Sequence, residues 1–350
     1  MVDPRLPDPR LPDPRLPDPR LALGVELPPV PVGSGPLGQA LLESWWKLAL
    51  ACVKVGAGVV WVTGGPAASG RAREVAAAAT SLTVPLWCDA CTIAAGGLAF
   101  VDDGVLGVVS GLPGDRHPAV LARDVTTLDV LSGGRAAVVL RWVGTQEPAG
   151  STCDLQAVCT YLGEAVAVCR AVLQDEDPVF EGRYLHIAGA VNRPPPSRTG
   201  GLPLLVDVPS GIPEPASRGP GVSYLLRQVA VGATAILCSD DPREIAMWRR
   251  LAVDRAGMLM RDGGTGEMPR IFCRTSLEED GGDTPLAGRG GVATRAGAAH
   301  AAGADGIVVR LRGDSPRGKR DGVDAAVVSD ASDAERVAER LSSCFDPWRR

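Results

Sequence analysis

Residues 105–140, VLGVVSGLPGDRHPAVLARDVTTLDVLSGGRAAVVL, contain the pattern that decides the fold. The apolar run Val105–Val109 is followed by a helix that begins at Pro118, because proline at the first helical position loses no hydrogen bond. The residues that recur there at helical spacing are Leu121, Val125, Leu128 and Leu131. Gly133-Gly134 ends the helix, and a second apolar run, Ala136–Leu140, follows. The stretch predicts a strand, a crossover helix and a parallel strand.

The same alternation continues on both sides of this stretch. Further strand candidates are Ala22–Leu27, Val59–Thr63, Val84–Cys88, Leu204–Val208, Ala233–Cys238, Ile271–Arg274 and Gly306–Leu311. Helical patterns separate them, in the segments 41–52, 71–80, 91–101, 155–173, 222–231, from Asp241 onward, 289–302 and 332–341. Continuous apolar strands belong in a parallel sheet that is covered on both faces. About eight alternations predict a (β/α)8 TIM-like barrel with an irregular insertion, 177–201, before strand 5; a doubly wound open sheet is the alternative.

Composition narrows the class of protein. The chain has 350 residues, of which 45% are hydrophobic and 22% charged, values typical of a globular protein. The formal net charge of −5 and the 4% aromatic content argue against a nucleic-acid-binding surface. No apolar run reaches the ~20 residues that span a bilayer, and no signal-peptide pattern opens the chain. We therefore expect a cytoplasmic protein that binds neither nucleic acid nor membrane.

The N-terminal segment is a repeat of Asp-Pro-Arg-Leu-Pro from Asp3 to Leu21. Proline at this density blocks both helix and sheet, so we expect residues 1–21 to be an extended, disordered tail. A recognition arm for a proline-binding partner is the alternative. Residues 22–350 then form one barrel domain.

The nine cysteines are spread along the chain and lie mostly in apolar runs, which predicts reduced, buried thiols. Cys88 and Cys91 form one C-x-x-C pair. A zinc site needs about four ligands, and none of the three histidines has ligand spacing to that pair. We therefore expect no metal site.

Chemistry in a β/α barrel takes place at the carboxyl ends of the strands. His117, before the helix at Pro118, and Asp207, after an apolar run, are candidates for proton transfer; helix caps or a solvated turn are the alternatives. Arg141 and Arg310 could hold a phosphate with paired hydrogen bonds, or form surface ion pairs. The other candidates at strand ends are Glu26, Thr63, Gly64, Gly65, Ser110, Trp142, Ser210, Ser239, Asp240, Arg274 and Arg312.

Two blocks of sequence resemble the luciferase-like monooxygenase family of flavin- or deazaflavin-dependent oxidoreductases. The first block, 107–135, contains His117-Pro118, Ala122, Thr127-Leu128-Asp129 and Ser132-Gly133-Gly134-Arg135. The second contains Phe180-Glu-Gly182-Arg-Tyr184 and the prolines Pro194, Pro195 and Pro196, which precede the fifth strand. The resemblance implies a β/α barrel that binds reduced FMN or the deazaflavin coenzyme F-420 at its mouth. It implies an oxidoreductase or monooxygenase that acts on a small organic substrate, whose identity the resemblance does not give. A homodimer is one oligomeric state that we consider.

The resemblance also implies a set of site residues. The strand end at Val109-Ser110 would lie behind the flavin ring, and family members often have a non-proline cis peptide bond there. Gly64-Gly65 stand where many deazaflavin-dependent members have Asp-His, and Arg141-Trp142 stand where glycines usually let the flavin approach. The residues expected to bind the cofactor are Thr63, Gly64, Gly65, Val109, Ser110, Arg141, Trp142, Ser210 and Gly211. A non-catalytic barrel that has lost its cofactor site is the alternative.

Overall fold

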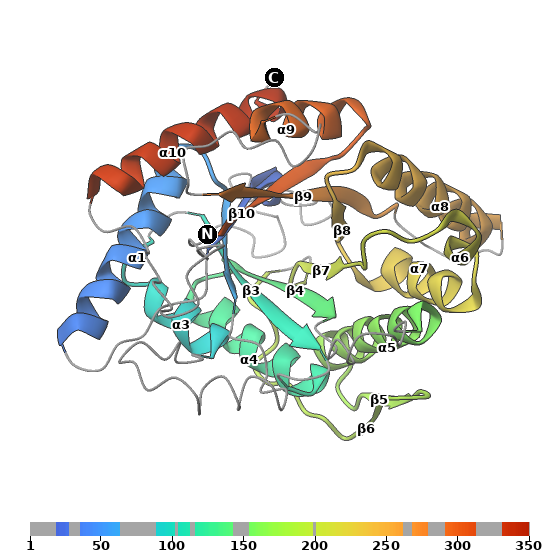
Figure 1. Cartoon of the computed structure of the whole chain (residues 1–350). Coiled ribbons are helices and arrows are strands. Elements are labelled where there is room, and N and C mark those ends of the chain that lie inside the picture. The colour runs from blue at the N-terminus through green and yellow to red at the C-terminus, as the bar shows by residue number, and fades with distance from the viewer. Residues whose placement is uncertain are drawn as a thin grey trace, which may run out of the picture.

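The closed barrel predicted from the sequence is confirmed, and the open sheet is excluded. The structure is a computed structural model, and it describes residues 19–27, 36–63, 89–101, 104–112, 116–142, 154–198, 201–261, 268–278, 291–312 and 331–349. Parallel strands close into one ring in the order β1-β2-β3-β4-β7-β8-β9-β10 (Figure 1). Their bounds are β1 (Leu23–Glu26), β2 (Val59–Thr63), β3 (Val105–Leu112), β4 (Ala136–Trp142), β7 (Leu204–Asp207), β8 (Ala235–Ser239), β9 (Arg270–Glu278) and β10 (Gly306–Arg312).

Helices form the outer layer of the barrel (Figure 1). The helices are α1 (Pro36–Lys54), α3 (Ala90–Gly97), α4 (Pro118–Leu131), α5 (Leu155–Gln174), α6 (Glu214–Ser217), α7 (Pro220–Gly232), α8 (Pro242–Arg261), α9 (Val292–Ala301) and α10 (Ala331–Phe345), with 3-10 turns at Pro19–Ala22 and Asp346–Trp348. By length and composition α5 could cross a membrane, but most of it is buried in the fold, where it packs against α4, α7 and β4. It is a core helix of the barrel.

Several boundaries differ from those predicted. β9 runs from Arg270 to Glu278 and so extends well beyond the short apolar run, because its polar residues continue the ladder with β10. The last helix begins at Ala331, one residue before the predicted start at residue 332. The predicted helix 71–80 and strand 84–88 lie outside the described residues, and the barrel closes without the latter.

The predicted tail boundary after residue 21 is too late. Pro19–Ala22 form a 3-10 turn, and the Leu21 side chain is fully buried at the end of the barrel core. The physical reason is visible in the last repeat unit, where Ala22 replaces the proline that follows leucine in the others, so the chain can enter β1. Residues 1–18 lie outside the described residues.

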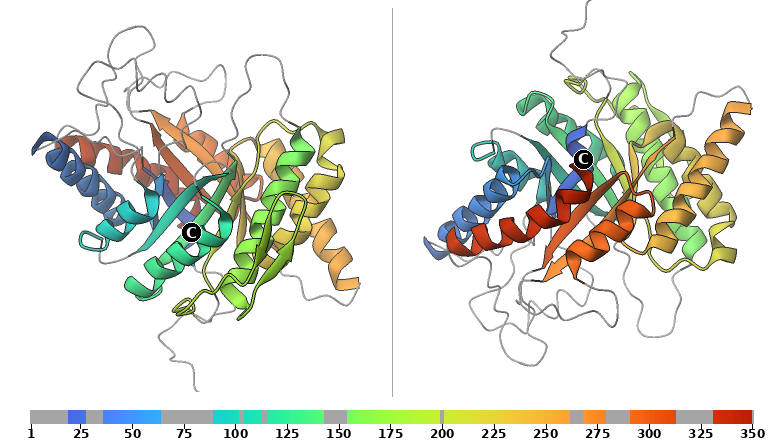
Figure 2. Two further views of the ribbon diagram at one scale, coloured as in Figure 1. Left: turned by 90° about the horizontal axis from the view of Figure 1, so that it is seen from below. Right: turned by 90° about the horizontal axis from the view of Figure 1, so that it is seen from above.

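The insertion before the fifth barrel strand contains a two-stranded antiparallel hairpin, β5 (Val179–Glu181) and β6 (His186–Ala188). It lies beside α5, outside the ring of strands (Figure 2). The buried carboxylate of Glu164 on α5 anchors it by accepting backbone N–H groups of Arg183, Tyr184 and Leu185 at 2.7, 2.8 and 2.9 Å. A Cβ at Gly182 would overlap that carboxylate, which explains the glycine between Phe180 and Tyr184.

Two hydrophobic layers fill the fold, one between strands and helices and one inside the barrel. Trp61 on β2 is the largest side chain of the inner layer and is fully buried. It fits because Gly24 and Gly107 present no side chains: a Cβ at either would collide with the indole. The barrel interior is therefore packed below the level of the strand ends, as in other β/α barrels.

Candidate active site

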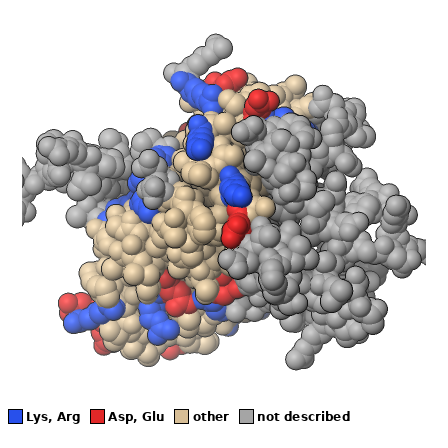
Figure 3. Space-filling view, turned by 90° about the vertical axis from the view of Figure 1, so that its left-hand side faces the viewer, with Lys and Arg blue, Asp and Glu red and all other residues tan. Residues whose placement is uncertain are grey.

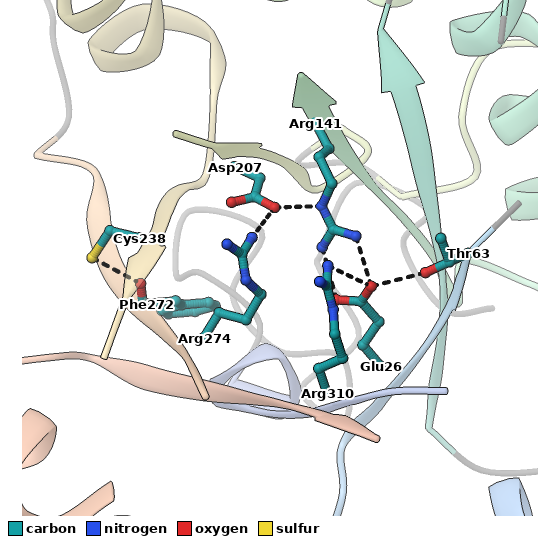
Figure 4. Close-up of polar contacts among 8 residues, drawn as sticks. All are labelled: Glu26, Thr63, Arg141, Asp207, Cys238, Phe272, Arg274 and Arg310. Carbon is teal, nitrogen blue, oxygen red and sulfur yellow. Dashed lines mark hydrogen bonds and ion pairs between the residues drawn. The ribbon is translucent and has the colours of Figure 1, made fainter. Parts of the chain in front are cut away.

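Polar side chains from six strands meet at the carboxyl end of the barrel (Figure 4). They are Glu26 on β1, Thr63 on β2, Arg141 on β4, Asp207 on β7, Arg274 on β9 and Arg310 on β10. We call this set the rim network. Side chains alternate along a strand, so Arg141 and Asp207 face the interior because they stand two residues beyond the interior residues Val139 and Leu205.

Arg141 occupies the centre of the rim network and spans the barrel. Its Nη1 and Nη2 donate to Oε1 and Oε2 of Glu26 at 2.6 and 2.7 Å, a two-pronged pair between guanidinium and carboxylate. Its Nε donates to Oδ2 of Asp207 at 2.5 Å. Glu26 and Asp207 are each less than 5% exposed, so this ion-pair chain is held in a buried setting.

Each carboxylate has a second cationic partner. Nη2 of Arg310 lies 3.0 Å from Oε1 of Glu26, and the Thr63 hydroxyl donates to the same oxygen at 3.0 Å. Nη1 of Arg274 pairs with Oδ2 of Asp207. The charges therefore alternate in an open chain that begins at Arg310 and ends at Arg274.

The balance of charge in the rim network sets its pKa values. Burial raises the pKa of Glu26, but Arg141 and Arg310 outweigh burial and lower it from 4.5 to about 2. Burial lowers the pKa of Arg141, and the two carboxylates reverse this effect and raise it above the usual value. The pKa of Arg310 is lowered, by burial and by the charges of Arg141 and Arg274, which Glu26 offsets only in part. Three cations and two anions leave one positive charge unbalanced within the network.

Only some of the predicted site residues reach this network. Thr63, Arg141 and Asp207 belong to it, and Val109 lies in the inner layer below. Ser110 shares the outward parity of Val108 and is buried on the helix side of β3, which corrects its assignment to the mouth. The peptide bond between Val109 and Ser110 is trans.

Trp142, which was predicted to bind the cofactor, also faces away from the mouth. It follows the inward-facing Arg141, so it points outward, and its ring packs edge-on against Tyr161 of α5 with centroids 5.5 Å apart. The bulky pair Arg141-Trp142 therefore splits between the two faces of β4. Only Arg141 enters the space that the resemblance assigns to the cofactor.

The loops after β7 and β8 are tied to α8. Ser210 and Gly211 are exposed, and the Gly211 N–H donates to the Glu244 carboxylate. The Ser239 hydroxyl donates to the other oxygen of Glu244 at 2.5 Å. Asp240 is paired with Arg295 at 2.9 Å. These contacts position the loops.

His117 serves as the N-cap of α4. Its side chain is exposed, and Nδ1 accepts the Ala119 N–H at 3.2 Å. It lies in the loop between β3 and α4, and it makes no recorded contact with the rim network among the described residues. Asp207, the other proton-transfer candidate, is a charge partner of two arginines. Gly64 and Gly65 lie outside the described residues.

Sequence reasoning placed Glu26, Arg274 and Arg310 at strand ends but did not assign them to the cofactor site. The signal was the two-residue period: each follows an interior residue by two positions, as Arg274 follows Phe272 and Arg310 follows Val308. The apolar run Val59–Thr63 predicts that Trp61 lies in a buried strand, but it does not predict that the indole closes the barrel below the mouth. Among the described residues, no group of three His, Cys, Asp or Glu side chains could hold a metal ion.

Asp129 and Arg135, two residues of the first block that carries the resemblance, have structural roles at the other end of the barrel. Asp129 is fully buried and accepts the backbone N–H of Ala136 at 3.3 Å and of Ser197 at 2.8 Å, which ties α4 to β4 and to the proline-rich insertion. Arg135 donates to the Val101 carbonyl at 2.7 Å. Residues at this end of a β/α barrel support stability.

The same central region matches a known family. Residues 105–216, which run from β3 through α4, β4, α5, the hairpin and β7 to α6, match the family described as luciferase-like monooxygenase. This segment is similar to the luciferase-like monooxygenases. No curated protein matches the chain in sequence.

Solved structures share the fold of the whole barrel. Monooxygenase RslO1 from Streptomyces bottropensis superposes with a TM-score of 0.58 at 16% identity, covering 94% of this chain and 99% of that chain. An F-420-dependent secondary alcohol dehydrogenase, in complex with an F-420–acetone adduct, gives 0.55 at 12% identity, with coverages of 93% and 99%. The coenzyme F-420-dependent tetrahydromethanopterin reductase from Methanopyrus kandleri gives 0.53 at 14% identity, with coverages of 91% and 97%. At these identities the likeness shows a shared fold.

Proposed function

We propose that this protein is a luciferase-like oxidoreductase that uses FMN or coenzyme F-420 at the carboxyl end of its barrel. The family match over residues 105–216 carries this proposal. The similar structures support it, since their names describe a monooxygenase, a dehydrogenase and a reductase on the same fold. The proposed substrate is a small organic molecule.

The residues of the mouth fit a flat, anionic cofactor. Val109 and Gly111 face inward on β3, and Gly111 presents no side chain beside Arg141, its register partner on β4. The ring would be held against this side of the mouth, with Thr63 of β2 next to it. When bound, the cofactor supplies the hydride transfer or the activation of oxygen.

The chain itself supplies charge and shape. Arg141 donates three of its five N–H groups to carboxylates, so its position is determined before any ligand binds. Its positive charge would stabilise negative charge on a cofactor bound in the mouth. Trp61 and the packed layer around it close the barrel below the mouth, which would keep water from reaching a bound cofactor through the interior.

Titration of the purified protein with FMN and with F-420, followed by fluorescence quenching, tests the proposal. We expect one of them to bind in the micromolar range. Gly111→Val places a side chain where the ring would lie and should weaken binding at least about 10-fold. Ser110→Ala, on the opposite face of the same strand, is the matched control and should leave binding unchanged. If neither cofactor binds at high micromolar concentration, the oxidoreductase proposal is rejected.

We further propose that the protein is cytoplasmic and binds no nucleic acid. Every cysteine that the structure describes is a free, buried thiol, as expected in a reducing compartment. On the described part of one face, acidic and basic side chains are interspersed, without a basic stripe (Figure 3). Homodimer formation remains a prediction, which the mass in solution tests.

A further inference from the structure

Within the described residues, the rim network is an open chain of alternating charges, and one further anion would close it into a ring. In order, it runs from Arg310 to Glu26, Arg141, Asp207 and Arg274, so both ends are cations. The two ends lie on neighbouring strands, β10 and β9, and the register partner of Arg274 is Val308, two residues before Arg310. That offset separates their Cα atoms by about 5 Å across the strands and about 7 Å along them. One anion between the two guanidinium groups would close the ring.

Three observations indicate that this position is built for a ligand. The network has one positive charge in excess. Among the described residues, Arg310 Nε is buried without a hydrogen-bond partner, and unmade buried donors are costly. Arg274 and Arg310 are 20% and 27% exposed, compared with 12% for Arg141, so the two end cations are the members open to the mouth.

We propose that Arg274 and Arg310 together bind the oxyanion group, a carboxylate or a phosphate ester, of the substrate. This inference rests on the proposed function for the reaction, and it adds the chemical class of the substrate. Two guanidinium groups bind such groups well because their N–H donors match the spacing of the oxygens. β9 lies across the barrel from β3 in the strand order, so the oxyanion would be held opposite the ring. The substrate would then extend from the arginines toward the cofactor.

Inorganic phosphate is the probe, and the full chain without cofactor is the sample. The melting temperature and the heat of binding are measured against sodium phosphate, with sodium chloride at the same ionic strength as reference. We expect saturable binding of phosphate that chloride does not reproduce. Arg274→Gln and Arg310→Gln should each weaken it at least about 10-fold, the loss expected for one charged hydrogen bond. Arg250→Gln, which removes a surface partner of Glu214, is the matched control and should bind phosphate as the unchanged protein does.

Circular dichroism verifies that the variants fold. If the glutamine variants do not fold, Arg274→Lys and Arg310→Lys keep the charge and remove the planar fork, and phosphate binding should still weaken. Equal phosphate binding by the unchanged protein and by these variants would overturn the proposal. So would stabilisation by chloride that equals that by phosphate.

FMN and riboflavin distinguish the two sources of an oxyanion. If the arginine variants weaken FMN binding but not riboflavin binding, the site holds the phosphate of the cofactor, and the substrate assignment is wrong. If phosphate still binds when FMN is saturating, the assignment is supported. Failure of the proposed function has a separate signature: neither FMN nor F-420 binds, whether or not phosphate does.

Discussion

Replacement of Glu26 by glutamine tests the reasoning about the rim network most directly. The substitution keeps the shape of the side chain and removes the charge that Arg141 and Arg310 share. Two buried or half-buried cations then lose a partner, and removal of one member of a buried ion pair typically costs about 3–5 kcal/mol. We expect the free energy of unfolding at pH 7 to fall by that amount.

The pH dependence of this loss follows from the pKa of Glu26. In the folded chain this pKa is lowered from 4.5 to about 2, so the ionised group stabilises the fold above pH 4.5, and the stability is lost as the pH falls toward 2. The gap between the two values corresponds to about 3 kcal/mol, of which about 2 kcal/mol is lost by pH 3. Glutamine does not titrate, so the difference between the two proteins should narrow by about 2 kcal/mol between pH 7 and pH 3.

Urea unfolding at several pH values between 3 and 8, followed by circular dichroism, measures this difference. Glu214→Gln is the control, because the ion pairs that Glu214 makes within the described residues, with Arg218 and Arg250, are exposed, and its loss should cost less than about 1 kcal/mol. A Glu26→Gln variant as stable as the control, or a difference that stays constant from pH 7 to pH 3, would refute the reasoning.

Three further substitutions test the packing that supports the mouth. Leu21→Ala should lower the free energy of unfolding by about 2–5 kcal/mol in urea titrations, because this side chain is fully buried, whereas removal of the repeats before Pro19 should change nothing. Gly107→Ala should lower the melting temperature, at a cost of about 1–3 kcal/mol, through collision with Trp61; an unchanged value would contradict the packing. Glu164→Gln should cost about 1–3 kcal/mol and speed hydrogen exchange of the hairpin amides that it holds; exchange at the original rate would show that the carboxylate is dispensable.

The sequence by itself determined where most strands and helices lie. Apolar runs such as Val59–Thr63 coincide with the observed strand, and the proline at 118 and the glycines at 133 and 134 bound α4 as predicted. These signals are local, because each depends on the backbone preferences of a few neighbouring residues. Polar residues at the ends of long strands escaped the same reasoning, as the extension of β9 to Glu278 shows, because ladder hydrogen bonds continue after the apolar run stops.

The sequence predicts at which end of the barrel the candidate site lies, but it does not predict which of its side chains are in contact. Strand order alone puts Arg141, Asp207 and Arg310 at one end of the barrel. The contacts between these side chains depend on the closure of the barrel. Glu26 and Arg141 are 115 residues apart, and they pair across the barrel interior because the sheet closes into a ring. Local sequence does not record such a pairing.

The alternation of side chains along each pleated strand decides which of the remaining residues face the mouth and which face the helices. One residue of difference in position sends Arg141 into the mouth and Trp142 onto α5, and leaves Ser110 on the helix side of β3. The sequence thus determined a β/α barrel with its polar residues at the strand ends. Tertiary structure alone decided which of those residues face one another, because ring closure and strand register, rather than local preference, control contacts between distant side chains.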